Sequence, residues 1–150
     1  MRLEVRWPAG VRLESLEAGR LAVFLDDTCA IVEPLAAHPD DPDAWVRAYL
    51  VRDVPTVWNV TILGRQEGVT DLGWPAVVLR TRITHGDRLI EQRLSVVYRM
   101  LEYFAAVSVR VPGDRMPAVE PLWLAALRTA RPDWRVDDAI CVHELLGGLT

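Results

Sequence analysis

The sequence predicts an α+β domain in which an antiparallel β-meander sheet is flanked by two amphipathic helices. Apolar residues fall at every second position through residues 57–111, which is the period of a β-strand. Two turn signals interrupt this stretch, Gly-Trp-Pro at 73–75 and His-Gly-Asp at 85–87. Outside it, apolar spacings of three and four residues predict the helices.

The composition indicates one folded domain over residues 1–150. A chain of 16.9 kDa with 51% hydrophobic and 25% charged residues can bury a conventional core without metal or disulfide support. The net charge of −4 argues against nucleic acid as a partner. All 17 basic residues are arginine, a bias that codon usage in a GC-rich genome also produces, so every positive side chain is a planar guanidinium group.

The N-terminal part of the chain predicts short strands separated by turns. Leu21, Val23 and Leu25 alternate with Ala22, Phe24 and Asp26, which supports a strand but leaves open which face is buried. The predicted strands are residues 2–7, 10–16, 20–25 and 28–33. The opening residues lack an apolar core of signal-peptide length, and no run approaches the roughly 20 residues of a membrane span. We therefore expect a cytoplasmic protein.

The first helix is predicted after the breaker cluster at residues 39–42. Asp41 can cap it, with Pro42 at its first position, where a missing N–H costs nothing. The predicted helix covers Pro42 to Val51, with Pro55 marking its end. One side of the helix would carry Trp45, Tyr49 and Leu50, with Arg47 and Arg52 toward water.

The meander predicts one apolar face and one arginine-rich face. A helix within residues 89–110 is the alternative, because Leu94, Val97 and Leu101 also fit a helical period and no glycine marks a turn before Tyr103. Crowded β-branched and aromatic residues favour the hairpin. The predicted apolar face holds Trp58, Val60, Ile62, Val77, Leu79, Thr81, Ile83, Ile90, Leu94, Val96, Tyr98, Tyr103, Ala105, Val107 and Val109. The predicted opposite face holds Asn59, Thr61, Arg65, Arg80, Arg82, Glu91, Arg93, Ser95, Ser108 and Arg110.

The second helix is predicted to begin near Asp114 and to end at Arg131-Pro132. Its apolar stripe needs a sheet to cover. A short strand is expected over residues 139–142. The stripe consists of Val119, Leu122, Trp123, Ala126, Leu127 and Ala130.

No reaction centre, metal site or cofactor site is expected. Cys141 and His143 are two apart, but with Cys29, Asp137 and Asp138 they follow no zinc spacing. The acidic stretch from His38 to Asp43 lacks the pattern of a calcium loop. Ser15, Ser95 and Ser108 fall in predicted strands instead of a nucleophile turn, and no glycine-rich phosphate loop is present. Cys29 and Cys141 are expected to be reduced thiols, and whether they lie close together is left open.

The arginine face is the candidate binding surface. Arg80, Arg82, Arg93 and Arg110 would lie on neighbouring strands, and Trp74 in a turn beside them could anchor a protein partner. The alternative is a solvated face in which Glu91 and Glu102 pair with the arginines, each pair being worth little.

The order of elements, together with the turn Gly73-Trp74-Pro75, resembles the α/β sandwich of the PsbP-type, Mog1 and DcrB-like proteins. That resemblance covers most of the chain and implies a non-enzymatic binding protein. One cytoplasmic branch consists of adaptor chaperones for type VI secretion toxins, and other branches are lipoproteins, which the missing signal peptide disfavours. No functional residue can be matched to the family.

Three functional hypotheses remain open. The first is a cytoplasmic adaptor or chaperone, monomeric or homodimeric, that binds a segment of a partner such as a secretion effector by strand addition or by cradling a helix. The second is an immunity or antitoxin-like inhibitor that uses the acidic residues 40–43 and 137–138. The third is a small-ligand carrier or enzyme, which needs a closed pocket lined by His38, His85 or His143.

Overall fold

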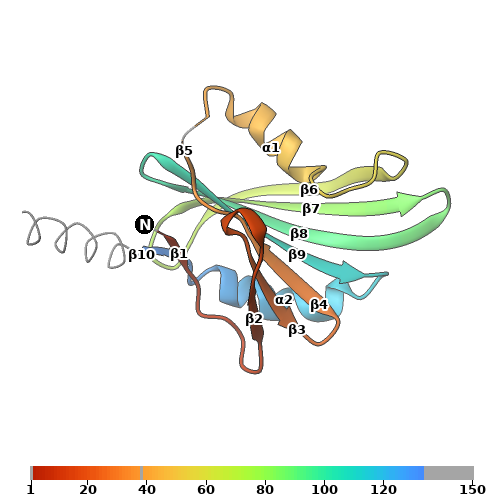
Figure 1. Ribbon diagram of the computed structural model, residues 1–150, viewed down its shortest axis with the longest axis horizontal. Helices are drawn as coiled ribbons and strands as arrows, with labels where there is room; N and C mark the ends of the chain where they lie inside the picture. Colours follow the sequence, from red (N-terminus) through yellow and green to blue (C-terminus); the bar gives the residue numbers. More distant parts are fainter. Residues whose placement is uncertain (1, 38, 134–150) are drawn as a thin grey trace, which may run out of the picture.

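A large antiparallel sheet runs through the molecule, with one helix against each of its faces (Figure 1). The computed structural model describes residues 2–37 and 39–133. The sheet order is β2-β3-β4-β9-β8-β7-β6, with β5 beside β9. Its strands are β2 (Arg12–Ser15), β3 (Leu21–Leu25), β4 (Thr28–Val32), β5 (Ala36–Ala37), β6 (Asn59–Val69), β7 (Pro75–His85), β8 (Arg88–Met100) and β9 (Tyr103–Pro112). The predicted fold class is confirmed.

The N-terminal segment lies beside the last described residues. β1 (Arg2–Glu4) pairs antiparallel with β10 (Arg131–Asp133) in a separate two-stranded sheet. A short 3-10 helix, η1 (Glu17–Gly19), joins β2 to β3. The four strands predicted before residue 34 are all present. The strand predicted over residues 139–142 lies outside the described residues.

Both tight turns of the meander form where a residue adopts positive φ. Gly86 takes φ +60° between β7 and β8. The β8–β9 turn has only two residues, Leu101 and Glu102, between the paired Met100 and Tyr103. Leu101 supplies the positive φ of 56° there, which glycine usually provides in such turns. The predicted hairpin is therefore confirmed, and the helical alternative is wrong.

α1 (Pro42–Leu50) begins as the sequence predicts but ends earlier. The Asp41 carboxylate accepts a hydrogen bond from the Ala44 backbone N–H at 3.0 Å, and Pro42 opens the helix. The predicted range ends one residue later, at Val51, which is the C-cap residue of α1. The residues that follow form a loop that lies against Arg93 and Arg110 of the sheet. That loop carries Asp53 at φ +62°.

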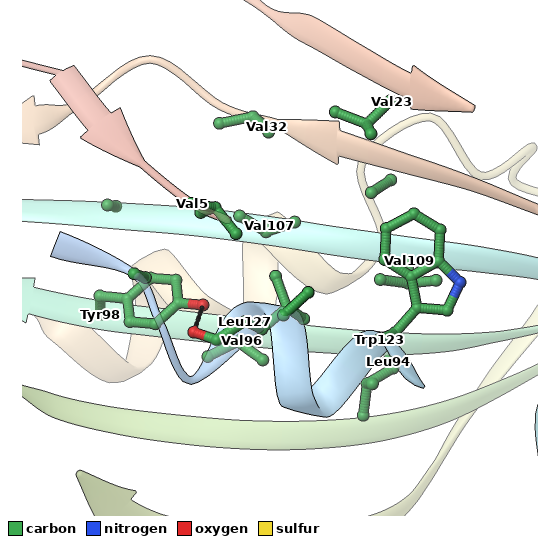
Figure 2. Packing of buried hydrophobic residues seen from close by; sticks show 14 of the residues in the cluster. Val5, Val23, Val32, Leu94, Val96, Tyr98, Val107, Val109, Trp123 and Leu127 are labelled. Carbon is green, nitrogen blue, oxygen red and sulfur yellow. Dashed lines mark hydrogen bonds between the residues drawn. The ribbon is translucent and has the colours of Figure 1, made fainter. Parts of the chain in front are cut away.

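α2 (Met116–Leu127) also ends before its predicted boundary. Residues 131–133 form β10 instead, since their backbone pairs with β1. Trp123 is fully buried and donates its indole N–H to the Thr28 hydroxyl at 3.2 Å. Tyr98 of β8 donates its hydroxyl to the Leu127 backbone oxygen at 2.7 Å, as Figure 2 shows. α2 is thus joined to the sheet by polar contacts as well as by packing.

Each face of the sheet has its own apolar core. The larger core lies under α2, and the smaller one lies under α1. The larger core contains Val23, Leu94, Val96, Tyr98, Val107, Val109, Trp123 and Leu127 among others (Figure 2). The smaller core contains Tyr49, Leu50, Leu79, Val97, Phe104 and Ala106.

A bulge in β8 decides which side chains share a face. Ile83 lies opposite Glu91 and Thr84 lies opposite Leu89, so Ile90 is an extra residue in β8. Beyond the bulge the register is shifted by one residue, and β7 is paired with the other parity of β8. The prediction that Val77 and Leu79 share a face with Leu94 and Val96 is therefore wrong. Val77 and Leu79 lie under α1.

Candidate functional site

The single arginine face predicted from the sequence does not form. A regular hairpin continued from the His85–Arg88 pair would place Arg80 opposite Arg93, but the bulge at Ile90 places Leu94 there. Arg80 and Arg82 lie on the α2 face, whereas Arg93 and Arg110 lie opposite one another on the α1 face. The four arginines therefore do not make one surface. Their role in binding a partner stays a prediction.

Arg93 and Arg110 instead hold the loop after α1 against the sheet. Arg93 is only 6% exposed; it donates to the Glu91 carboxylate at 2.7 Å and to the Arg52 backbone oxygen at 3.1 Å. Arg110 donates to Asp53 at 3.1 Å. Burial lowers the pKa of Arg93, and Arg110 beside it lowers that pKa further while Glu91 opposes the change.

Two acids complete an ion-pair network around this loop. Glu33, whose side chain is 4% exposed, pairs with Arg20 at 2.9 Å and with Arg52 at 3.1 Å. Asp53 bridges Arg20 at 2.6 Å and Arg110 at 3.1 Å. Burial raises the pKa of Asp53, but hydrogen bonds from Arg20 and Arg110 outweigh it and leave that pKa lowered. These ion pairs therefore help to hold the loop after α1 against the sheet.

On the α2 face, Arg80 pairs with Glu120 of α2 at 2.5 Å. Arg82 is exposed and lies opposite Gln92. Glu102, a predicted partner of the arginines, lies in the β8–β9 turn.

Trp74 is half-buried against the larger core instead of standing free in solvent. Its backbone N–H donates to the Thr70 hydroxyl, and its carbonyl accepts from the Thr70 N–H at 2.8 Å. Gly73 supplies φ +87° within this predicted turn. No tryptophan among the described residues is fully exposed, so none of them offers a whole indole ring to a partner.

β6 is the exposed element that the sequence reading missed. It lies at one end of the sheet order, and its outer backbone edge faces no other strand among the described residues (Figure 1). Nine of its eleven residues are classed as exposed, with Ile62 at 54%, Leu63 at 50% and Val69 at 66%. The opposite edge strand, β2, has only four residues and carries Arg12 and Glu14. A long edge strand offers another chain more unpaired backbone groups than a short one does.

A hollow lies on each face of the sheet beside β6. On the α2 face it measures about 120 Å³, between β6 and the end of α2. On the α1 face it measures about 360 Å³, between β6 and the start of α1. Glu67 and Gly68 of β6 line both hollows, so this one strand segment borders both of them. Among the apolar lining residues are Val78, Tyr98 and Leu127 on the first and Val46, Val77 and Phe104 on the second.

The side chains considered as candidates for catalysis or metal binding make structural contacts. Ser95 and Ser108 share a buried contact of 3.3 Å, and burial raises the pKa of the Cys29 thiol, which makes it a poor nucleophile. Asp41 is occupied in capping α1. Among the described residues, no histidine lines either of the two hollows beside β6.

Within residues 2–37 and 39–133, no group of three or more His, Cys, Asp or Glu is arranged to hold a metal ion. Over the same part of the chain, no helix combines the length and apolarity needed to cross a bilayer. His38, Trp134, Asp137, Asp138, Cys141 and His143 lie outside the described residues, and so do the predictions made for them.

Neither a protein-family model nor a curated protein matches the sequence. Solved structures do match the fold. The solution structure of cyanobacterial PsbP (CyanoP) from Synechocystis sp. PCC 6803 is similar with a TM-score of 0.66 and 13% identity, over 88% of this chain and 93% of that one. The chain has a PsbP-like fold.

A second structure supports the PsbP-like fold. The crystal structure of PA94 from Pseudomonas aeruginosa, a protein of unknown function, matches with a TM-score of 0.55 and 15% identity, over 89% of this chain and 99% of that one. Both identities are low, so the similarity extends to the arrangement of helices and strands and not to any site. The predicted resemblance to the Mog1/PsbP-like sandwich is confirmed at that level.

Proposed function

We propose that the protein is a non-enzymatic binding module that takes up an extended segment of a protein partner by strand addition to β6. The observation that carries this proposal is the long open edge of β6, which exposes Ile62, Leu63 and Val69, with a hollow beside it on each face. In its more specific form, the protein is a cytoplasmic adaptor that holds a secretion toxin or effector before export.

An added strand would use both hollows. Its backbone would continue the ladder along β6, which supplies affinity without regard to sequence. Its side chains would alternate between the two faces. Gly68 lines both hollows, and a side chain built there would meet nothing within 4 Å, so space is open at this point of the edge.

The lining predicts the chemistry of the segment. Apolar side chains on both faces favour an alternating or continuous apolar sequence. Arg99 of β8 lines the hollow on the α1 face, Arg128 after α2 lines the hollow on the α2 face, and both side chains are exposed. Acidic residues flanking the apolar positions of the partner could reach these guanidinium groups.

Differential capture tests the proposal. The tagged protein is purified from its native cells beside an Arg99→Glu/Arg128→Glu variant and an Arg47→Glu control. Arg47 is a suitable control because it is exposed on α1 and lines neither hollow. The partner should be retained by the parent and the control but lost by the double variant. Backbone hydrogen exchange of residues 60–70 should slow when the purified partner is added. A partner captured equally by all three proteins, with exchange along β6 unchanged, would overturn the proposal.

A further inference from the structure

We propose that β6 also pairs with β6 of a second copy of the chain, antiparallel about a two-fold axis at Gln66. This inference goes beyond the proposed function, because it concerns what covers the edge when no partner is bound. It rests on the sequence of β6 and on the geometry of its side chains.

Residues 63–69 read Leu-Gly-Arg-Gln-Glu-Gly-Val, a sequence that is self-complementary about its central glutamine. A two-fold interface requires that each contact be repeated with the subunits exchanged. With Gln66 on the axis, Arg65 lies opposite Glu67 of the partner subunit, and Glu67 lies opposite the partner's Arg65. One register therefore forms two equivalent ion pairs.

The outer positions match in the same register. Leu63 lies opposite Val69 of the partner subunit, and the equivalent pair repeats at the other end. All four side chains belong to residues at least half exposed in the single chain, so the dimer would remove apolar surface from water at both ends of the ladder.

The charged side chains already share the face that this pairing needs. Arg65 lies opposite Leu79 of β7 and Glu67 lies opposite Val77, which places both on the α1 face. Within one chain they form an exposed ion pair of 3.0 Å. Exposed ion pairs contribute little to stability, so exchanging these pairs for pairs between subunits costs little.

The two glycines of β6 provide an independent observation. Gly64 and Gly68 have ordinary φ, and a Cβ built on either one meets nothing within 4 Å. No packing within the chain requires glycine at these positions, although glycine weakens a strand. Glycine inside a strand often marks a bulge or the close approach of another backbone. Gly64 follows the bulge at Leu63, whereas Gly68 lies in regular register, and in the proposed dimer Gly64 lies opposite Gly68 of the partner subunit.

A dimer that pairs through the other edge strand, β2, is less favourable. β2 is only four residues long, so it offers far fewer backbone groups for pairing than β6, which has eleven residues. An edge-to-edge dimer therefore uses β6, where a long open edge would otherwise be free to pair with unrelated chains.

Charge reversal tests the register. Purified protein should sediment at twice 16.9 kDa. Glu67→Arg would place two arginines opposite each other twice and should weaken dimerisation at least tenfold. The Arg65→Glu/Glu67→Arg double variant restores both pairs and should recover the dimer. Glu14→Arg on β2 is the control and should leave it unchanged. A parent that stays monomeric up to the highest soluble concentration, or a dimer indifferent to Glu67→Arg, would overturn the inference.

A cysteine on the axis gives a second readout. In a Cys29→Ser/Cys141→Ser background, Gln66→Cys should form a disulfide-linked dimer under mild oxidation, since the two side chains face each other across the axis. Ile62 is also exposed, but two copies of Ile62→Cys would lie roughly 26 Å apart along the ladder and should not cross-link. A monomeric protein that still takes up its partner along β6 would contradict only the dimer. A dimer that takes up no partner would contradict only the proposed function.

Discussion

The hydroxyl of Tyr98 donates a hydrogen bond of 2.7 Å to the backbone oxygen of Leu127. Tyr98 lies in the middle of the larger core, and Leu127 is the last residue of α2. The final carbonyls of a helix have no partner within the helix, so this contact satisfies one of them inside the core. It also fixes where α2 ends against β8.

Replacing Tyr98 with phenylalanine should therefore lower stability. Tyr98→Phe keeps the ring but leaves the Leu127 oxygen with only the longer bond of 3.3 Å from the Ala130 N–H, and should reduce the free energy of unfolding by about 0.5–1.5 kcal/mol. Urea unfolding followed by tryptophan fluorescence measures the change. Tyr103→Phe is the matched control, because Tyr103 is 38% exposed, and it should change stability by less than about 0.5 kcal/mol. Equal effects of the two substitutions would show that the contact contributes nothing.

Among the acids of the ion-pair network, Glu33 should be the one whose replacement lowers stability most. Glu33→Gln would leave Arg20 and Arg52 facing a neutral side chain at a buried position, and should cost about 2–3 kcal/mol. Glu14→Gln removes the exposed pair with Arg12 and should cost less than about 0.5 kcal/mol. Thermal and urea unfolding of the two variants provide the comparison. A Glu33 variant as stable as the Glu14 variant would contradict this assignment.

The lowered pKa of Asp53 predicts a loss of stability at acid pH. Its pKa is lowered in the folded protein, so it contributes stability above the ordinary value of 3.8 and loses that contribution as pH falls through the folded pKa. Asp53→Asn should therefore be less stable than the parent at pH 7, and the difference should shrink below about pH 4. Asparagine tolerates the positive φ at this position, so the backbone is preserved. A difference that stays constant from pH 7 to pH 3 would contradict the lowered pKa.

The β8–β9 turn offers a stabilising substitution. Leu101 alone of the two turn residues has positive φ, the pattern of a type II′ turn, which favours glycine at its first central position. Because Leu101 is exposed, Leu101→Gly should relieve backbone strain and raise the free energy of unfolding by about 0.5–1 kcal/mol. Glu102→Gly, at the position with negative φ, should instead be neutral or destabilising. A Leu101→Gly protein that unfolds earlier than the parent would rule this out.

The strands and turns could be predicted because their signals are local. Alternation over residues 57–111 follows directly from strand geometry, and Gly73 and Gly86 mark turns by the φ values that they adopt. Asp41 and Pro42 mark the start of α1 for a similarly local reason. The ends of both helices were harder, because tertiary pairing of the residues that follow decides them, as it does for β10.

The faces of the sheet could not be predicted, because each is covered by a helix and both parities of β8 are apolar. Val96 and Val97 are neighbours in sequence and belong to different cores. One extra residue, Ile90, then exchanges the partners of all positions beyond it, and Leu63 does the same in β6. Gly64 is a local signal for the bulge in β6, but no such residue marks the bulge at Ile90. The prediction of one arginine surface was therefore wrong, although the predicted hairpins were correct. The glycines at 64 and 68 were the available signal for the open edge.

The edge of β6 has room for one neighbour at a time. If both the second copy and the partner segment use it, the two equilibria are linked by mass action, and the apparent affinity for the partner must fall as the concentration of the protein itself rises. A binding titration repeated at several protein concentrations would reveal that competition. In that case the dimer would hold β6 covered, and dilution or a tighter-binding partner would free the monomer.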